Sequence, residues 1–312
     1  MVKISLISPC YNEADSIESF IEAVFNQSYQ DFEVVVVDGG STDGTYEKAR
    51  LYAEKYPGKL IVIKEVGERS PANAKNIGIN RATGDLLYFK DVDCRLIDHE
   101  AFSKIVKCYL RLKQPDILYI RVNYISHLNG LIRRVIHYMH YSHGVDAVYR
   151  VDVAKKVLFD PNLGAGEDVD FHRRCLELTK ATECSEQILI YYRPESLKRY
   201  IRRYKWYGRT FRSFYRKYPQ EFKNALHEFK VSAYIIFFSI TTLLILTSYP
   251  KLWPSLFLIA IPLVKHLIYS FKSSTIKRYF FIFALLSYLR AFSFTSGFIL
   301  SFLSKGPLGR EK

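Results

Sequence analysis

Short apolar runs alternate with amphipathic segments over the first 93 residues, and this alternation constrains the fold more than any other feature. Four such runs predict buried strands, at 2–8, 32–37, 60–65 and 85–89. The spacing of apolar side chains predicts a helix over 17–25, and the intervening segments 45–53 and 72–81 are also expected to be helical. Strand–helix alternation predicts βαβ units, and therefore an α/β domain with a mainly parallel sheet.

Three aspartates directly follow these predicted strands. Asp38 ends the second run and precedes a Gly-Gly turn, and Asp91 and Asp93 follow the fourth run. Ligands of parallel α/β sheets bind at the carboxyl ends of the strands, where these side chains are expected. Carboxylates suit Mg²⁺ or Mn²⁺, which proteins often hold with one or two carboxylates and substrate phosphates. Taken alone, an Asp-x-Asp pair is more often a turn or a helix cap, and Asp38 an ordinary loop residue.

Five motifs in chain order resemble those of family 2 inverting glycosyltransferases with the GT-A fold. They lie at 8–13, 37–45, 74–78 with 82–85, 91–93 and 166–168, and the resemblance covers roughly residues 2–215. The segment 204–209 and the apolar tail are most similar to the succinoglycan-biosynthesis type. Lys75 departs from the family pattern, which usually has Arg there. Arg95 stands where lipid-phosphate mannose synthases often place another metal-coordinating side chain.

The resemblance implies a GT-A domain that binds a nucleotide-sugar together with a divalent metal, Mn²⁺ or Mg²⁺. Its implied nucleotide-sugar contacts are Pro9, Tyr11 and Glu13 at the base and ribose, Asp38 at the base, and Asp91 at the ribose and diphosphate. Asp93 is the implied metal ligand.

At the acceptor side, the resemblance implies that Asp168 is the catalytic base and that Glu167 shapes the acceptor site. In a single displacement at the anomeric carbon, such a carboxylate removes the proton of the acceptor hydroxyl. The residues alone also allow a simpler role, because acidic side chains stabilise the start of a helix expected over 169–180. Both roles can hold at once.

Charge and hydropathy divide the chain into two parts. Residues 1–194 carry 25 Lys and Arg against 27 Asp and Glu, whereas residues 195–312 carry 20 against 4. Three stretches of the second part approach the length of a bilayer core, 231–249, 252–271 and 279–303, although Arg290 interrupts the last. We therefore predict a catalytic domain over 1–194, a basic and aromatic interfacial helix over 195–230, and a membrane region over 231–312 with two to three transmembrane helices.

The eleven Lys and Arg of 195–230 place that side of the membrane in the cytoplasm by the positive-inside rule. The prediction is a multi-pass cell-membrane protein with a cytoplasmic catalytic domain, whose five cysteines are expected to stay reduced. The number of spans and the side of the C-terminus stay open, because three full spans would place the basic C-terminus outside.

Basic and aromatic residues interleave over 199–217, a pattern that in isolation is also typical of nucleic-acid binding. Directly before an apolar stretch it favours an interfacial helix that meets membrane lipids or a lipid-linked phosphate, without nucleic acid. The candidate lipid or phosphate contacts are Arg202, Arg203, Lys205, Trp206 and Arg209. His137, His140 and His143 recur every three residues, a spacing that could align them for a metal on a helix. The adjacent Arg133, Arg134, Tyr138 and Tyr141 favour a solvated or interfacial face instead.

These features together predict a membrane-anchored inverting glycosyltransferase. It would move a sugar from a nucleotide-sugar to a hydroxyl of a lipid-linked or membrane-proximal glycan. Transfer onto a polyprenyl or dolichyl phosphate is the alternative within the same class. A nucleic-acid-binding membrane protein and a purely structural membrane subunit are the alternatives from other classes. The donor base, the sugar and the acceptor stay open.

Overall fold

The computed structural model describes residues 1–125, 144–193, 196–223 and 280–303, with seven single residues between them: Leu226, Lys230, Ala233, Tyr234, Phe237, Thr247 and Lys251. These residues form two compact units. The first contains 1–125 and 144–193, and the second contains the remaining described residues.

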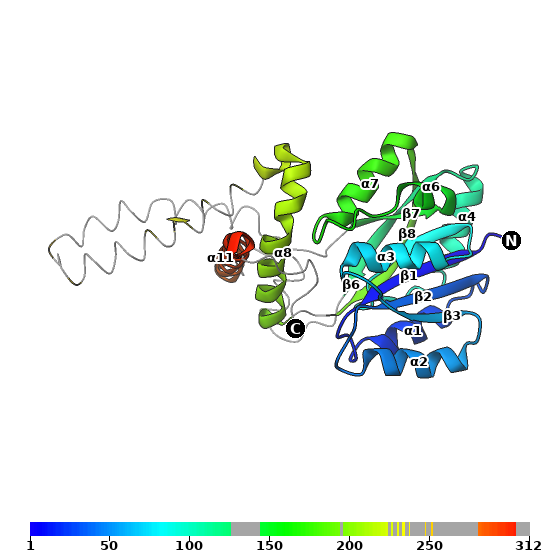
Figure 1. The fold of residues 1–312 in the computed structure, drawn as a ribbon. Helices are drawn as coiled ribbons and strands as arrows, with labels where there is room; N and C mark the ends of the chain where they lie inside the picture. Colours follow the sequence, from blue (N-terminus) through cyan, green and yellow to red (C-terminus); the bar gives the residue numbers. More distant parts are fainter. Residues whose placement is uncertain are drawn as a thin grey trace. The chain divides into compact units, whose positions relative to one another are not determined.

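The first unit begins with the predicted alternation of strands and helices (Figure 1). Its first seven elements are β1 (Ile4–Cys10), α1 (Ile17–Phe25), β2 (Phe32–Asp38), α2 (Thr45–Lys55), β3 (Leu60–Lys64), α3 (Pro71–Arg81) and β4 (Leu86–Phe89). All seven expected elements are confirmed, with boundaries within two residues. Its later elements are β5 (Cys94–Leu96), α4 (Ala101–Arg111), β6 (Ile117–Ile125), β7 (Gly144–Arg150), α6 (Val151–Val157), α7 (Glu167–Leu178) and β8 (Ala181–Tyr192).

The described strands form one sheet in the order β3-β2-β1-β4-β7-β6-β8-β5. The neighbours among β1 to β4 are parallel, as predicted. The prediction of a mainly parallel sheet is wrong for the second half. There β7 runs antiparallel to both β4 and β6, and β5 runs antiparallel to β8, so only the β6–β8 pair is parallel.

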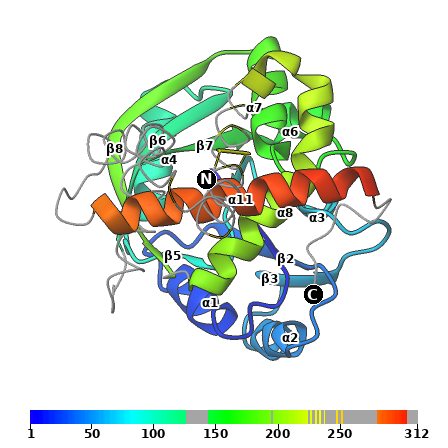
Figure 2. The ribbon, with the colours of Figure 1, turned by 90° about the vertical axis from the view of Figure 1, so that its left-hand side faces the viewer.

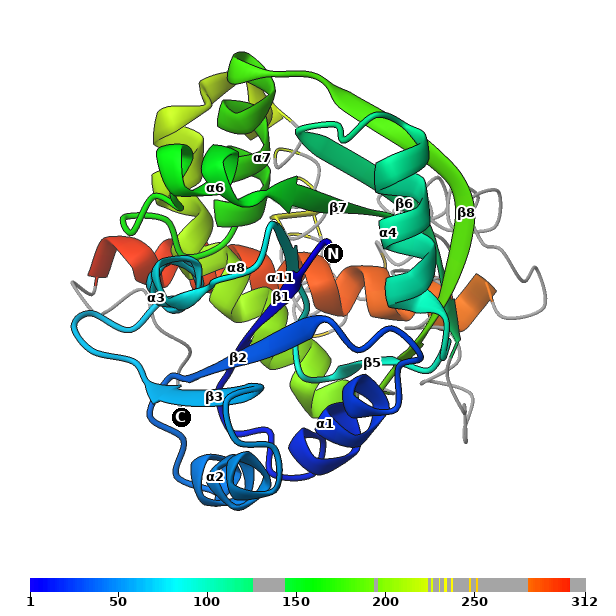
Figure 3. The same cartoon turned by 90° about the vertical axis from the view of Figure 1, so that its right-hand side faces the viewer.

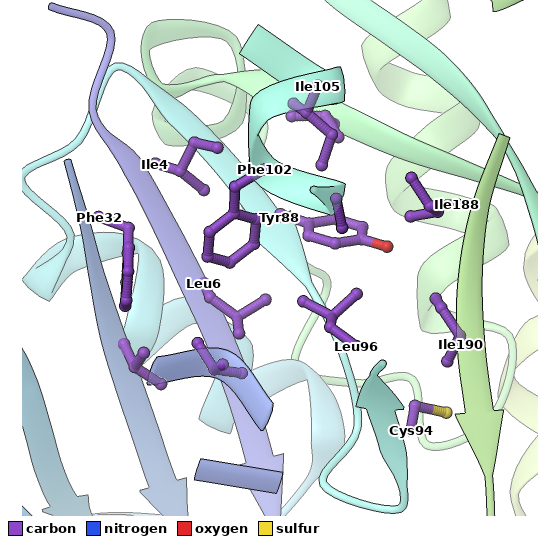
Figure 4. Close-up of a cluster of buried hydrophobic side chains, with 14 of the residues drawn as sticks. Ile4, Leu6, Phe32, Tyr88, Cys94, Leu96, Phe102, Ile105, Ile188 and Ile190 are labelled. Atoms are coloured by element: carbon purple, nitrogen blue, oxygen red, sulfur yellow. The ribbon is translucent and has the colours of Figure 1, made fainter. Parts of the chain in front are cut away.

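Alternating side chains of the central strands fill two apolar layers. Ile4 and Leu6 of β1 face a core shared with α1 and α4, whereas Ile7 faces a second core with α3 and α7. Figure 3 shows α3, α6 and α7 on one side of the sheet and α1 and α2 on the other. Figure 4 shows the first core, in which Tyr88 of β4 lies beside Phe102 of α4. Because both faces of the sheet are covered, the central strands are mostly apolar.

The second unit contains α8 (Leu197–Lys217), the short 3₁₀ helix η1 (Pro219–Glu221) and α11 (Phe280–Leu303). Figure 2 shows α11 crossing α8. The two backbones approach so closely that a Cβ atom on Gly208 would lie 1.8 Å from the carbonyl oxygen of Phe294, and one on Gly297 would lie 1.9 Å from that of Lys205. Glycine at these two positions therefore makes the crossing sterically feasible.

Of the three predicted transmembrane segments, the structure describes mainly the third. Nearly all of 231–249 and all of 252–271 lie outside the described residues. The third segment, 279–303, coincides with the helix α11. None of the helices formed by the described residues combines the length and apolar character that crossing a membrane requires. His137, His140 and His143 also lie outside the described residues.

The cysteine prediction is wrong for one pair. Cys108 of α4 and Cys184 of β8 form a disulfide, with their Cα atoms 6.0 Å apart, whereas Cys10, Cys94 and Cys175 are free and buried. The two bonded residues are 76 positions apart in sequence. They meet only because α4 packs on β8, and the local sequence carries no sign of this.

Candidate functional site

The candidate site lies where β2, β1 and β4 end side by side. These three strands are parallel neighbours, so the segments that follow them meet at one edge of the sheet. Those segments are 11–16, 39–44 and 90–93, and they contain most of the residues predicted to bind the nucleotide-sugar. These three segments are distant in sequence, and the fold of the first unit brings them to the same edge of the sheet.

Asp38 organises the turn that follows β2. Its side chain is 1% exposed, and one oxygen, Oδ2, accepts hydrogen bonds of 3.0 Å from the backbone N–H groups of both Gly40 and Ser41. The Cys10 thiol donates to the other oxygen at 3.8 Å. Gly40 has a φ of +77°, which a side chain would strain. The base contact predicted for Asp38 stays a prediction, and the residue also shapes the loop itself.

The loop after β1 is bonded to the turn after β2. Asn12, with a φ of 54°, accepts from the Thr42 N–H at 2.9 Å and donates its own N–H to Ser41 Oγ at 2.8 Å. The Glu13 N–H donates to Thr45 Oγ1 at 2.8 Å, and Glu13 is 5% exposed. These bonds hold the two loops in one arrangement. Pro9 and Tyr11, also predicted donor contacts, are half-buried at the end of β1.

Asp91 and Asp93 lie in a tight turn after β4. The Cys94 N–H donates to the Asp91 carbonyl at 2.9 Å, which closes the turn. Asp91 is exposed and Asp93 is half-buried. The Arg193 N–H donates to the Asp93 carbonyl at 3.0 Å, so the residue after β8 holds this turn as well.

Arg193 also reaches the loop after β1, a role that the sequence did not reveal. Its guanidinium donates to Ser16 Oγ at 2.9 Å and to Asp15 Oδ2 at 2.8 Å, and lies 3.4 Å from Glu13 Oε2. It therefore connects the predicted donor loop with the Asp91–Asp93 turn. No motif marks Arg193, because its partners lie far away in sequence.

Lys75 pairs with Glu167, the carboxylate predicted to shape the acceptor site. Its ammonium group donates to Glu167 Oε1 at 2.8 Å, and the two side chains are only 11% and 10% exposed. Burial of the Lys75 ammonium group lowers its pKa. The negative charges of Glu167, Asp168 and Asp91, in decreasing order of effect, outweigh burial and raise the pKa of Lys75 above its ordinary value. Burial raises the pKa of Glu167, and Lys75 opposes this shift. The sequence identified Lys75 only as a departure from the family pattern.

The rest of the same motif fixes α3 and the loop that leads to α7. The Asn76 side chain donates to the Phe159 carbonyl at 2.8 Å and accepts from the Phe159 N–H at 2.7 Å. A Cβ on Gly78 would lie 2.3 Å from Ile7 Cγ2, so glycine allows α3 to lie against β1. The 74–78 motif thus positions α7 through Lys75 and Asn76.

Asp168 is the second residue of α7 and is exposed. Its Oδ1 accepts from the Val169 N–H at 2.8 Å, a contact within the first helical turn. One turn later, His172 lies between two hydroxyl groups, those of Tyr119 at 2.6 Å and Tyr149 at 2.8 Å. Burial lowers the pKa of His172, although Asp168 opposes this. The helix start thus presents one exposed carboxylate next to a fixed imidazole.

The aspartates of the turn fit a divalent cation that arrives with a diphosphate. Among the residues that the structure describes, no group of three or more His, Cys, Asp or Glu side chains could hold a metal by itself. Mg²⁺-type sites in phosphate-transfer enzymes use one or two carboxylates, and the substrate supplies further oxygens. The exposed Asp91 and the half-buried Asp93 supply hard oxygens of this kind.

The predicted lipid or phosphate contacts all lie on α8, in the second unit: Arg202, Arg203, Lys205, Trp206 and Arg209. Arg202 is exposed and the other four are half-buried. Their contact with lipid stays a prediction.

Known proteins share the first part of this chain. Residues 5–158 match the family Glycosyl transferase family 2. The chain is 43% identical over 93 residues to glycosyltransferase AglE of Haloferax volcanii, covering 29% of this chain and 30% of AglE. It is 33% identical over 93 residues to the amylovoran biosynthesis glycosyltransferase AmsB of Erwinia amylovora, covering 30% of this chain and 31% of AmsB. The matches thus span about a third of these relatives' lengths.

One solved structure resembles most of the chain. It is the mannosyltransferase PcManGT from Pyrobaculum calidifontis in complex with GDP-Man and Mn²⁺, with a TM-score of 0.58 and 19% identity, covering 97% of this chain and 88% of PcManGT. At this identity the likeness shows a shared fold, a mixed α/β GT-A-like architecture.

Proposed function

Because residues 5–158 match the family Glycosyl transferase family 2, we propose that the protein transfers a sugar from a nucleotide-sugar, with inversion, to a hydroxyl of a lipid-linked or membrane-proximal glycan. The observation that carries this proposal is the buried Lys75–Glu167 pair. The charges of Asp91 and Asp168 both raise the pKa of its ammonium group, which supports placing the predicted donor and acceptor acids in one site.

In the proposed reaction, Asp168 accepts the proton of the acceptor hydroxyl. That oxygen forms a bond to the anomeric carbon while the bond from this carbon to the nucleoside diphosphate breaks. Asp91 and Asp93 would hold Mn²⁺ or Mg²⁺, which neutralises the charge on the leaving diphosphate. Lys75 holds Glu167, the residue before Asp168, and thereby fixes the start of α7.

The charge of α8 favours a second candidate, transfer onto a polyprenyl phosphate. This helix of 21 residues carries nine Lys and Arg and no acidic residue. Such a surface attracts anionic lipid headgroups and lipid-linked phosphates. A phosphate acceptor is already ionised and needs no base, so Asp168→Asn separates the two candidates. The variant should lose transfer to a hydroxyl and keep transfer to a lipid phosphate.

Attachment to the cell membrane, with the catalytic domain on the cytoplasmic side, is part of the proposal. It is supported by the sequence alone, through the apolar stretches 231–249 and 252–271 and the basic residues that precede them.

Binding of a nucleotide-sugar tests the proposal directly. The full chain, purified in detergent, is heated with GDP- or UDP-sugars and Mn²⁺ or Mg²⁺. The GDP-Man and Mn²⁺ bound to PcManGT make this pair the first to try. A ligand at 100 times its Kd stabilises the folded state by about 2.7 kcal/mol, which raises the unfolding midpoint. A well-folded protein that no nucleotide-sugar stabilises would refute the proposal.

A further inference from the structure

A buried charged cluster lies directly behind the Asp91–Asp93 turn. Lys90, the residue before Asp91, is 7% exposed, and its ammonium group lies 2.7 Å from Asp146 Oδ2 and 3.0 Å from the Tyr124 hydroxyl. The Tyr88 hydroxyl donates to the same Asp146 oxygen at 2.5 Å, and the Tyr124 hydroxyl donates to Asp146 Oδ1 at 3.3 Å. The cluster therefore joins β4, β6 and β7 through side chains.

The ion pair between Lys90 and Asp146 lies where the backbone pairing of β4 with β7 ends. Backbone pairing between β4 and β7 includes Tyr88 opposite Val148 and extends no further along β4. Continuing the same register places Lys90 opposite Asp146, at the point where the chain leaves the sheet for the turn. An ion pair thus takes over where the backbone pairing stops, while the Lys90 N–H still donates to the Ile7 carbonyl at 3.1 Å.

Tyr88 connects the cluster to the core. Its side chain is fully buried, and Figure 4 shows its hydroxyl pointing away from Phe102, toward the β8 side of the core. The ring is fixed by apolar packing and its hydroxyl holds Asp146, which in turn holds Lys90. The core thereby sets the position of the last residue before the turn.

Stability alone does not account for this ion pair. Replacing a buried ion pair by uncharged residues of similar volume is often neutral or stabilising, because desolvation offsets the attraction between the charges. The pair lies instead beside the turn that carries the candidate metal and diphosphate ligands. A rigid supporting layer is what such ligands need to keep their geometry.

We propose that Lys90 and Asp146 are positioning residues that hold Asp91 and Asp93 in place to bind a divalent cation with a nucleoside diphosphate. This inference rests on the proposed function, because it assigns the turn to the donor site. Loss of supporting residues of this kind typically weakens metal binding by about 10- to 100-fold.

The test compares the full-length wild type with Lys90→Met/Asp146→Asn. This double variant removes both charges and keeps an amide oxygen that can accept from Tyr88. Binding of Mn²⁺ in the presence of GDP, and separately of UDP, is measured from the free Mn²⁺ signal in electron paramagnetic resonance. Unfolding midpoints are recorded without ligand.

The matched control is Lys3→Met/Glu33→Gln. This pair, 2.9 Å apart with Glu33 3% exposed, lies at the amino ends of β1 and β2, the edge of the sheet opposite the turn. Whatever stability the control loses, its affinity for Mn²⁺ with nucleotide should stay at the wild-type value. The Lys90/Asp146 variant should bind at least about tenfold more weakly, with an unfolding midpoint close to that of the wild type.

Equal Mn²⁺–nucleotide affinity in the wild type and the Lys90/Asp146 variant overturns the inference and leaves the proposed function intact. A wild type that binds Mn²⁺ with no nucleoside diphosphate, ADP, CDP and dTDP included, overturns both. If the double variant does not fold, Tyr124→Phe decides instead, because it removes only the hydroxyl that contacts Lys90 and Asp146. That variant should bind two- to fivefold more weakly than the wild type, and unchanged affinity overturns the inference.

Discussion

Removing the charge of Lys75 should destabilise the protein, and the loss should grow with pH. In Lys75→Met, Glu167 stays buried at 10% exposure without its cation. Breaking a buried ion pair by removing one partner costs about 3–5 kcal/mol, because a buried charge is left uncompensated. For a domain of this size, 1 kcal/mol lowers the unfolding midpoint by about 2–4 °C, so a decrease of about 6–20 °C is expected.

The pH dependence follows from Glu167. Burial already raises the pKa of Glu167 above 4.5, and the Lys75 charge that opposes the rise is absent from the variant. The pKa of Glu167 in the folded variant is therefore higher still. Between the unfolded and folded pKa values the folded state binds a proton that the unfolded state does not, so stability falls as the pH rises. The destabilisation should be larger at pH 8 than at pH 5.

Urea unfolding of the full chain at both pH values measures this effect. Three further variants define its origin. Lys75→Arg keeps the charge and should retain most of the stability, and Lys75→Met/Glu167→Gln removes both charges and should recover most of it. Lys48→Met breaks an exposed pair with Glu18, and should cost less than about 1 kcal/mol. A Lys75→Met variant that loses no more than Lys48→Met, or loses equally at both pH values, would refute the reasoning.

Three other results are expected. Asp168→Asn should lower transfer to a hydroxyl by about 10²- to 10⁴-fold and leave the nucleotide-sugar Kd unchanged in calorimetry, and wild-type turnover would exclude Asp168 as the base. Gly78→Ala should destabilise the protein by about 1–3 kcal/mol in thermal unfolding, since the new methyl group would overlap Ile7; wild-type stability would show that α3 can move away. Thiol titration of the denatured chain should give three thiols without reductant and five with it, whereas five in both cases would exclude the Cys108–Cys184 disulfide.

The two halves of the first unit differ in how far their sequence predicts their structure. The strands β1, β2 and β4 are mostly buried on both faces, and all four of β1 to β4 are mostly apolar, so their positions were predicted to within two residues. β8 instead has buried residues at Cys184, Ile188, Ile190 and Tyr192, separated by exposed or half-buried ones. Such a strand is not a continuous apolar run, and neither its antiparallel neighbour β5 nor the antiparallel position of β7 was foreseen.

Part of the candidate site could also be predicted from the sequence. Asp38 ends β2, Asp91 and Asp93 follow β4, and the parallel pairing of both strands with β1 brings these ends to one edge, so the sequence by itself predicted that these acids belong together. The strands that carry these acids could be predicted from local sequence, because the side chains of a strand alternate between its two faces and a strand covered on both faces is an apolar run.

The tertiary structure decided which side chains hold these acids. Lys75 and Glu167 are 92 residues apart, and they meet because α3 and α7 pack on the same face of the sheet. Lys90 meets Asp146 because β7 lies antiparallel beside β4, and Arg193 reaches the loop after β1 because it follows β8. Such contacts depend on how distant segments pack, and the spacing of residues along the chain carries no record of that packing.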